Sequence, residues 1–286
     1  MVVTLHRPNS THEALRLKVE NSESMFLAGG QTLVAMMNAD LVEPTSLISL
    51  DNVSGLKDIE KKQDGSIRIG AMVRHAQITA SEMLRDAHTV IRAAAAVIAH
   101  PAIRNLGTIG GAVSHGDPNS DLCPALVAAD ARIEVTGPNQ SREISATKFF
   151  LDYLTTELEA NELLTGIILP PASAHSWGHY EKFARVEGDY ATTSVAVTLA
   201  LNENRMVDQL RIALGASGAT PIRVPSAENE LQGGNLDAAS VTETANKILA
   251  ACDPLDDVRG SSDYRRILIP RLIKKAVNKV RTLADL

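Results

Sequence analysis

Two glycine-rich turns constrain the fold of this chain more than any other feature of its sequence. The first turn is AGGQTL at residues 28–33; it follows a short apolar run, residues 25–28, that is typical of a strand, and it leads into a helix-like run at residues 33–38. The second turn is GTIGG at residues 107–111. Paired glycines let a backbone turn tightly and approach a ligand without a Cβ in the way. A helix that begins at such a turn points its free N–H groups at the same place, which favours an anion.

The two turns lie far apart in the sequence, which suggests a diphosphate held between two structural units. The hydroxyl groups of Thr32 and Thr108 can add donors to the turns. Neither turn matches G-x-G-x-x-G or G-x-x-x-x-G-K-S/T, so an ordinary Rossmann or P-loop site is disfavoured. A single Gly-Gly turn is more often only a turn, and the interpretation therefore depends on the presence of both.

The pattern of apolar residues and breakers predicts three units, at residues 1–55, 56–171 and 172–286. The chain has 286 residues, more than one average domain requires, and its 44% of hydrophobic residues can form a substantial core. In the first unit, Ser10 and Glu13 have the S-x-x-E spacing of a capping box. We expect this unit to contain helices at residues 14–19 and 33–38 and strands at residues 25–28 and 45–50.

The second and third units mix strands and helices. Asp64-Gly65 is a hairpin signal between two apolar runs, and Pro170-Pro171 ends the second unit. We expect the second unit to contain, in chain order, strands at 58–60 and 66–69, a helix at 90–99, a loop at 105–111, a helix at 125–131 and a strand at 132–135. We expect the third unit to contain strands at 194–201 and 207–214, a helix at 242–252, and a helix at 264–280 interrupted by Pro270.

Composition and charge exclude several classes of protein. The net charge is −6 with no dense block of Lys and Arg, and aromatic residues make up only 3%, so nucleic acid is not an expected partner. No apolar run approaches the ~18 residues of a membrane span, and the N-terminus lacks the pattern of a signal peptide. We therefore expect a cytoplasmic protein without a membrane span.

Metal binding is not expected on this chain. Cys123 and Cys252 lie far apart and belong to no C-x-x-C motif, which argues against a zinc site or an iron–sulfur cluster. His115, Asp117 and Asp121 form one conceivable set of ligands, but Asp-Pro and Asn-Ser in the same segment are ordinary turn formers. A carboxylate here can instead bind the hydroxyl groups of a ribose or ribityl chain.

Three further motifs follow the glycine turns. They are D-P-x-x-D at residues 117–121, YEKF at 180–183 with GDYA at 188–191, and D-x-R-G-S-x-x-Y-R-R at 257–266. Together with the two turns, in this order and over nearly the whole chain, they resemble the FAD-binding medium subunit of the carbon-monoxide dehydrogenase and xanthine oxidase family of molybdenum hydroxylases. Each motif alone is weak, and their order makes the resemblance specific. The arginines of the last motif are more typical of a solvated face or a subunit contact than of a binding site.

The resemblance implies an α+β fold for this chain, with a two-part FAD-binding domain of the vanillyl-alcohol-oxidase-like (PCMH) type. The third unit then corresponds to the C-terminal domain of the carbon-monoxide dehydrogenase flavoprotein, a sheet with helices. The first two units form the FAD cleft between them.

The resemblance also implies which residues bind the FAD diphosphate. Backbone amides of the first turn hold it from one unit, and the second turn holds it from the other. The residues expected at the diphosphate are Leu27, Ala28, Gly29, Gly30, Gln31, Thr32 and Leu33, together with Thr108, Ile109, Gly110, Gly111 and Ala112.

A second set of residues matches family positions that run past the cofactor or lie near the flavin ring. They are Ala99, His100, Asp121, Leu164 (with Ile167 as an alternative), Lys182 and Tyr190. Asp121 matches a carboxylate that contacts FAD. Lys182 matches a lysine at the polar edge of the ring, where a cation stabilises a reduced anionic flavin. The bare sequence favours a surface lysine at 182 and is compatible with a core aromatic at 190, so these two assignments depend on the resemblance.

The chain departs from the family pattern in two ways. The family often has Ser or His in the first turn, where this chain has Gln31 and Thr32; both can still form hydrogen bonds. Some relatives carry an extra iron–sulfur cluster in a Cys-rich loop, which Cys123 and Cys252 cannot supply.

The function that the resemblance implies is electron relay, with no catalytic residue on this chain. A large subunit with a molybdenum cofactor oxidises the substrate, and a small subunit with two 2Fe–2S clusters passes electrons to the FAD. The acceptor is NAD, a quinone or oxygen, and the assembly is a dimer of heterotrimers. The substrate is chosen by another polypeptide and does not follow from this sequence.

Two alternatives stay open at the level of sequence. One is a self-sufficient flavoenzyme such as an enolpyruvyl-sugar reductase, which needs an acid facing the flavin; only Glu181 and Glu187 are candidates. The other is a scaffold that has lost its cofactor, which the intact glycine pairs argue against.

Overall fold

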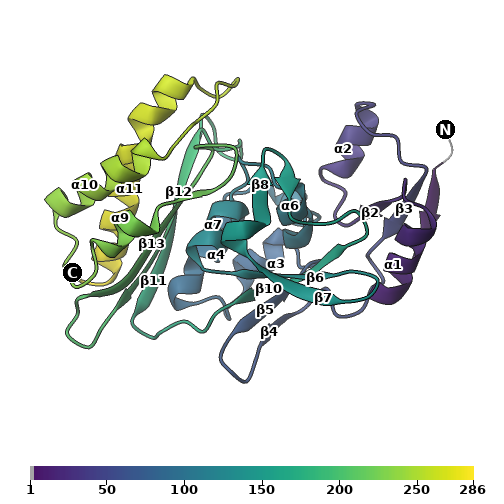
Figure 1. Ribbon diagram of the computed structural model, residues 1–286, viewed down its shortest axis with the longest axis horizontal. Helices are drawn as coiled ribbons and strands as arrows, with labels where there is room; N and C mark the ends of the chain where they lie inside the picture. The colour runs from purple at the N-terminus through teal and green to yellow at the C-terminus, as the bar shows by residue number, and fades with distance from the viewer. Residues whose placement is uncertain (1–2) are drawn as a thin grey trace.

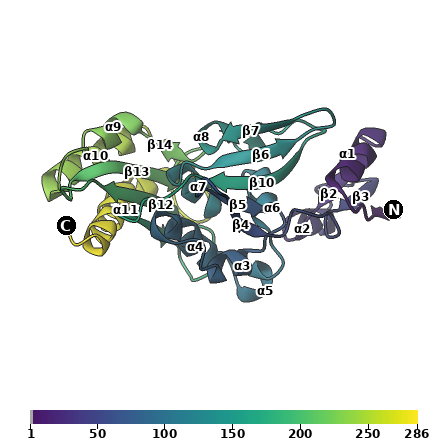
Figure 2. The same cartoon turned by 90° about the horizontal axis from the view of Figure 1, so that it is seen from below.

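The computed structural model describes residues 3–286 and contains three larger sheets that follow one another along the molecule (Figure 1). The N-terminal unit lies at one end, the C-terminal helices lie at the other, and the largest sheet lies between them (Figure 2). The mixture of helices and sheets confirms the expected α+β class. The boundaries predicted after residues 55 and 171 fall between the sheets; as limits of separate domains they stay predictions.

The first unit is a parallel three-stranded sheet with two helices. Its elements are β1 (Thr4–His6), α1 (Thr11–Glu20), β2 (Met25–Leu27), α2 (Leu33–Asn38) and β3 (Ser46–Ser49), in the sheet order β1-β3-β2. The predicted cap is confirmed, because the Ser10 side chain accepts a hydrogen bond from the N–H of Glu13 (3.2 Å). The buried face of α1 packs on β3 in a core that also contains Met72 and Leu163 of the second unit.

The second unit is an antiparallel five-stranded sheet. Its strands are β4 (Ile59–Lys61), β5 (Ile67–Gly70), β6 (Arg132–Thr136), β7 (Ser141–Ser145) and β10 (Leu163–Leu169), in the order β4-β5-β10-β6-β7. The central strand β10 is buried at all seven positions. The further elements of this unit are α3 (His75–Ala80), η1 (Asp86–His88), α4 (Thr89–Ala96), α5 (Pro101–Arg104), α6 (Ile109–His115), α7 (Leu122–Ala128), α8 (Ala146–Phe149), β8 (Phe150–Asp152) and β9 (Thr155–Thr156).

The third unit is an antiparallel four-stranded sheet between two helical layers. Its elements are β11 (Ser176–Phe183), β12 (Thr193–Leu201), β13 (Val207–Gly215), β14 (Ile222–Arg223), α9 (Pro225–Asn229), α10 (Ala238–Ala250) and α11 (Ser262–Leu283). Side chains alternate along β12. Val195 and Val197 join the core with α10 and α11, whereas Ala196 joins the core of the second unit. Small residues on that face let α4 and α7 pack closely against the sheet.

Four predicted elements differ from the structure. The helix expected at 90–99 ends at Ala96, because Val97 departs from helical geometry as its C-cap, and Ala99 in the turn beyond is left-handed (φ 39°). The helix expected at 125–131 spans 122–128, and Asp130 ends it with a φ of 54°. The loop expected at 105–111 is helical from Ile109. Pro270 does not interrupt α11, because burial of the face that contains Ile269 and Ile273 outweighs the lost N–H and the steric clash.

Candidate functional site

A cavity of about 340 Å³ lies between the first and second units, where the two glycine turns meet. The first turn, the second turn and the start of β10 form its walls. Of the predicted cofactor residues, those that line it are Ala28, Gly29, Gly30, Gln31, Thr32, Leu33, Thr108, Gly110, Gly111, Ala112 and Leu164. Segments far apart in the sequence therefore share one cavity, as the sequence predicted.

The first turn presents a run of backbone donors. Among residues 3–286, the N–H groups of residues 28–33 donate no hydrogen bond to any protein acceptor. Gly30 has a φ of +70°, a left-handed conformation that favours glycine. Within the turn, the Gln31 side-chain amide donates a hydrogen bond to the carbonyl oxygen of Gly29 (3.3 Å). Free amides at a cavity wall are the donors that a phosphate oxygen requires.

In the second turn, the N–H groups of residues 109–111 are used within the protein. The N–H of Ile109 bonds to the carbonyl of Val73 (3.0 Å), and that of Gly110 bonds to the carbonyl of Ala71 (2.8 Å). The N–H of Gly111 bonds to the side-chain oxygen of Thr108, the N-cap of α6 (3.1 Å). The row of free amides that we expected in this turn is therefore absent among the described residues. The O–H of Thr108 stays available as a donor because its oxygen acts as the acceptor.

Two of the glycines allow close packing of backbones. A Cβ on Gly29 would overlap the carbonyl oxygen of Leu106, just before the second turn. A Cβ on Gly110 would lie 2.6 Å from the Cβ of Ala71 and 2.7 Å from its carbonyl oxygen. Glycine at these positions therefore lets the two turns and the residue after β5 pack closely together.

His75 is a cavity residue that the sequence did not indicate. Its side chain is buried, and its Nδ1 has no hydrogen-bond partner in the described part of the chain. Burial, with a smaller contribution from the charge of Arg104, lowers the pKa of His75 from 6.5 to about 4. The imidazole is therefore neutral near pH 7. A lone histidine at the start of a helix carries no pattern by which sequence analysis can recognise this role.

A second group of predicted residues lies where the second and third units meet. Asp121 accepts a hydrogen bond from the Tyr180 hydroxyl (2.7 Å) and pairs with the Lys182 ammonium group (2.8 Å). Burial raises the pKa of the Asp121 carboxyl, and Lys182 and Tyr180 oppose that rise. Burial also raises the pKa of Tyr180 well above its usual value. We call these three residues the Asp121 cluster.

The remaining predicted residues lie close to this cluster. Lys182 also donates to the carbonyl of Val97 (3.2 Å), next to the turn that contains Ala99 and His100. Tyr190 is 46% exposed, and the guanidinium group of Arg259 lies over its ring, 4.9 Å from the centroid. Burial of the hydroxyl raises the pKa of Tyr190.

Three further predicted residues belong neither to the cavity lining nor to the surroundings of the Asp121 cluster. Ile109 and Ile167 are fully buried in the core of the second unit. Leu27 is the last residue of β2, and its carbonyl accepts a bond from the N–H of Leu50 (2.9 Å). Their apolar side chains position the turns and the sheet and contribute nothing polar to the site.

No group of three or more His, Cys, Asp or Glu that could hold a metal ion occurs within residues 3–286. Of the set considered from the sequence, only His115 lines the cavity; Asp117 accepts from the N–H of Asn119 (2.8 Å) and Asp121 pairs with Lys182. In the same part of the chain, no helix has the length and apolar character needed to cross a membrane.

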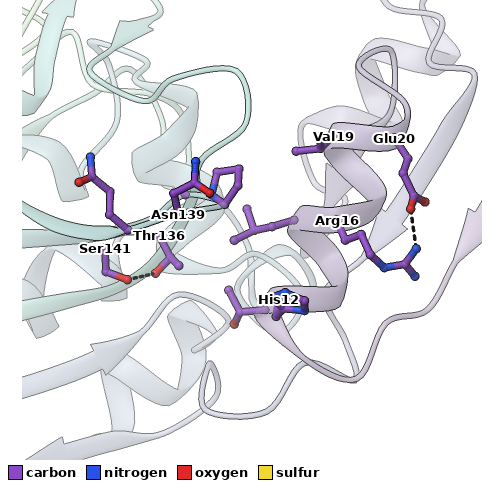
Figure 3. A pocket seen from close by; sticks show the side chains of 12 residues that line it. His12, Arg16, Val19, Glu20, Thr136, Asn139 and Ser141 are labelled. Carbon is purple, nitrogen blue, oxygen red and sulfur yellow. Dashed lines mark hydrogen bonds and ion pairs between the residues drawn. The ribbon is translucent and has the colours of Figure 1, made fainter.

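A larger groove of about 730 Å³ lies between α1 and the turn that joins β6 to β7 (Figure 3). Two of its side-chain pairs are hydrogen-bonded or ion-paired, Arg16 with Glu20 (2.6 Å) and Ser141 with Thr136 (3.2 Å). Neither glycine turn reaches this groove. The cavity between the two turns is therefore the better cofactor site.

Comparison with known families assigns the two halves of the chain. Residues 1–172 match the FAD binding domain in molybdopterin dehydrogenase, and residues 178–280 match the CO dehydrogenase flavoprotein C-terminal domain. The two-part FAD-binding fold with its C-terminal domain, expected from the sequence, is confirmed.

Named relatives cover nearly the whole chain. The nicotine 6-hydroxylase medium subunit of Paenarthrobacter nicotinovorans is 36% identical, covering 94% of each chain. The carbon monoxide dehydrogenase medium chain of Hydrogenophaga pseudoflava is 33% identical, covering 96% of this chain and 95% of the relative. The structure of carbon monoxide dehydrogenase from H. pseudoflava lacking the Mo-pyranopterin moiety superposes with a TM-score of 0.93, covering 98% of each chain at 33% identity.

Proposed function

Because the chain belongs to the family of FAD-binding medium subunits of molybdenum-containing dehydrogenases, we propose that its cavity between the two turns holds the diphosphate of FAD. The observation that carries this proposal is the run of N–H groups at residues 28–33 with no protein acceptor in the described structure. Around them, the cavity offers the Thr108 hydroxyl and the neutral imidazole of His75. Phosphate oxygens accept from all of these groups, so the residues present fit the cofactor.

The flavin ring is proposed to lie toward the Asp121 cluster and Tyr190. Bound FAD supplies the redox chemistry, and the protein positions it and sets its surroundings. Lys182 offers a donor there, but its charge is balanced by the carboxylate of Asp121 at 2.8 Å. A charge-balanced pair favours an anionic reduced ring less than the free cation that the sequence suggested. Leu164, on the cavity wall, can pack against the cofactor.

The chain is an oxidoreductase subunit, and we propose that it receives electrons from a small partner with two 2Fe–2S clusters. A large partner with a molybdenum cofactor completes the complex, which we propose to be a dimer of heterotrimers. Helix α2 supports an interface beside the cofactor. It follows the first turn, contains no charged residue and has no buried residue. A six-residue helix has little stability in water on its own, so an apolar surface of the small subunit is proposed to cover it.

The electron acceptor is proposed to approach the exposed edge beside Tyr190. Val186 and Val258 are 65% and 80% exposed in the two loops near this residue, and Arg259 adds a cation. NAD, a quinone and oxygen all remain candidates for this position. A self-sufficient reductase is disfavoured, because Glu181 is paired with Lys275 (2.9 Å) and Glu187 is exposed on a loop. Cytoplasmic localisation stays a prediction.

The first test is the visible absorption spectrum of the chain, alone and co-expressed with its partner subunits. We expect flavin bands, release of FAD on denaturation, and bleaching by substrate only in the complex. Gly30→Val alters the left-handed turn that presents the free amides, so this variant should contain no FAD. The matched control Gly137→Ala, where a Cβ meets no atom closer than 3.5 Å, should retain it. A colourless wild-type chain that takes up no added FAD in either preparation would overturn the proposal.

A further inference from the structure

The segment between α4 and α5 holds a strained turn. Helix α4 ends at Ala96, and Ala99 has a φ of 39°, a left-handed conformation that residues with a Cβ rarely adopt. Such an unfavourable backbone conformation occurs only where contacts with the surrounding structure stabilise it. The turn at residues 97–100 must therefore be stabilised by its neighbours.

Two cations hold the three successive carbonyl groups of this turn. The Arg104 guanidinium donates through Nη1 to the carbonyl oxygens of Ile98 (2.8 Å) and Ala99 (3.0 Å). Lys182 donates to the carbonyl oxygen of Val97 (3.2 Å) from the other side. The last carbonyls of a helix lack partners and carry partial negative charge, so cations stabilise them.

The turn connects the two ends of the proposed site. On one side it supports Gly188, where a Cβ would lie 3.0 Å from the Ala99 carbonyl oxygen and 3.0 Å from Cε1 of His100. Gly188 precedes Tyr190 by two residues in the same loop. On the other side, α5 runs into the second turn, where the N–H of Gly107 bonds to the carbonyl of Ile103 (2.7 Å).

We propose that Arg104 is a positioning residue for the flavin end of the FAD site. It fixes the turn at residues 97–100, and through Gly188 it fixes the loop that carries Tyr190, without itself lining the cavity. This inference rests on the proposed function, because it assumes that FAD extends from the cavity toward Tyr190. The charge of Arg104 also reaches His75 at the diphosphate end, so an electrostatic role there is the competing explanation.

Binding of FAD and of ADP to the full chain separates the two explanations, because ADP carries the diphosphate without the flavin. In Arg104→Gln, we expect the Kd for FAD to rise about tenfold or more, since two charge-assisted hydrogen bonds to the turn are lost. The Kd for ADP should stay within about twofold of the wild type. Arg104→Lys, which keeps a donor, should recover part of the FAD affinity. Equal weakening of FAD and ADP, or no weakening of either, would overturn the inference.

Amide hydrogen exchange in the FAD-free chain tests the clamp itself. Exchange at Ile98 and Ile103, whose N–H groups donate to the carbonyls of Ala95 and His100 on the two sides of the turn, should be about tenfold faster in Arg104→Gln than in the wild type, because the opening of the turn becomes easier. Unchanged exchange there would also overturn the inference. Arg132→Gln is the control, because Arg132 is half-exposed and paired only with Glu143 (3.0 Å). A wild-type chain that binds neither FAD nor ADP would instead count against the proposed function, while the exchange experiment still tests the clamp.

Discussion

In the first turn, the N–H groups of residues 28–33 have no acceptor within residues 3–286, whereas in the second turn those of residues 109–111 are bonded inside the protein. Both turns carry a Gly-Gly pair and a threonine. In the first, the threonine makes no capping bond; in the second, Thr108 caps α6. The first turn therefore offers donors to a ligand, and the second is a structural support that brings a wall of the cavity into position.

The difference shows that a glycine pair has more than one physical use. Gly30 supplies a left-handed backbone, while Gly110 supplies the space that Ala71 occupies. A Gly-Gly motif indicates a tight turn or a close approach of the backbone. Whether the N–H groups of that turn bind a ligand or stabilise the fold depends on which acceptors they have in the structure.

The largest expected effect concerns the support role of the second turn. In Gly110→Ala, the new Cβ would lie 2.6 Å from the Cβ of Ala71, the buried residue that follows β5. We expect the free energy of unfolding of the FAD-free chain to fall by about 2–3 kcal/mol, the cost of overpacking a close-packed site. Urea denaturation measures it, with Gly137→Ala as the control. A variant of unchanged stability that nevertheless loses FAD would mean that the second turn acts as a donor cradle after all.

The next effect depends on pH. His75 lies against Gly107 of the second turn, and its pKa is lowered from 6.5 to about 4 in the folded chain. As the pH falls below 6.5, the unfolded chain binds a proton that the folded chain resists until about pH 4, so stability is lost over this interval. We expect this contribution to be about 2 kcal/mol after allowance for partial solvation.

The contribution of His75 is isolated by comparing two chains. Urea unfolding of the FAD-free wild type and of His75→Gln at pH 7 and pH 4.5 should show a smaller loss for the variant. The buried His88, whose pKa is also lowered, is present in both chains and cancels in the comparison. An equal loss of unfolding free energy between pH 7 and pH 4.5 in the two chains would show that the neutral imidazole of His75 does not stabilise the second turn.

The same contrast explains what the sequence could predict. Capping, glycine turns and hairpins depend on residues a few positions apart, so the Ser10 cap, the first turn and the strand pair β4–β5 were predicted correctly. The order of motifs was sufficient to identify the family and its fold.

Features that depend on distant contacts were not predictable. The pairing of Lys182 with Asp121 joins residues 61 positions apart, and it changes a presumed free cation into a balanced pair. The helix that composition favours through residue 99 stops at Ala96, and Arg104 and Lys182 bind the carbonyls of the turn beyond it, which contains the left-handed Ala99. The partners of the N–H groups of residues 109–111 likewise lie in the loop that follows β5, at Ala71 and Val73, or in the cap of α6.

A smaller effect is expected from the cap of the second turn. Thr108→Val keeps the shape of the side chain but removes the oxygen that accepts from the N–H of Gly111 (3.1 Å). The FAD-free chain should lose about 1 kcal/mol of stability, as is usual for a lost N-cap. Thr108→Ser, which retains the acceptor, should lose much less. If the valine variant is as stable as the wild type, the Gly111 amide is free to bind a ligand and the two turns are alike.

The smallest effect on stability is expected at the corresponding position of the first turn. Thr32 precedes α2 but accepts no capping bond from it. Thr32→Val should therefore leave the unfolding free energy of the FAD-free chain within about 0.5 kcal/mol of the wild type. Its hydroxyl borders the cavity, so the Kd for FAD should rise about fivefold, the usual effect of one lost hydrogen bond. Flavin titration and urea unfolding of Thr32→Val and Thr108→Val, done in parallel, separate the two roles. A loss of stability in Thr32→Val as large as in Thr108→Val would mean that both turns support the fold. Unchanged FAD affinity in Thr32→Val would show that the Thr32 hydroxyl does not belong to the cofactor site.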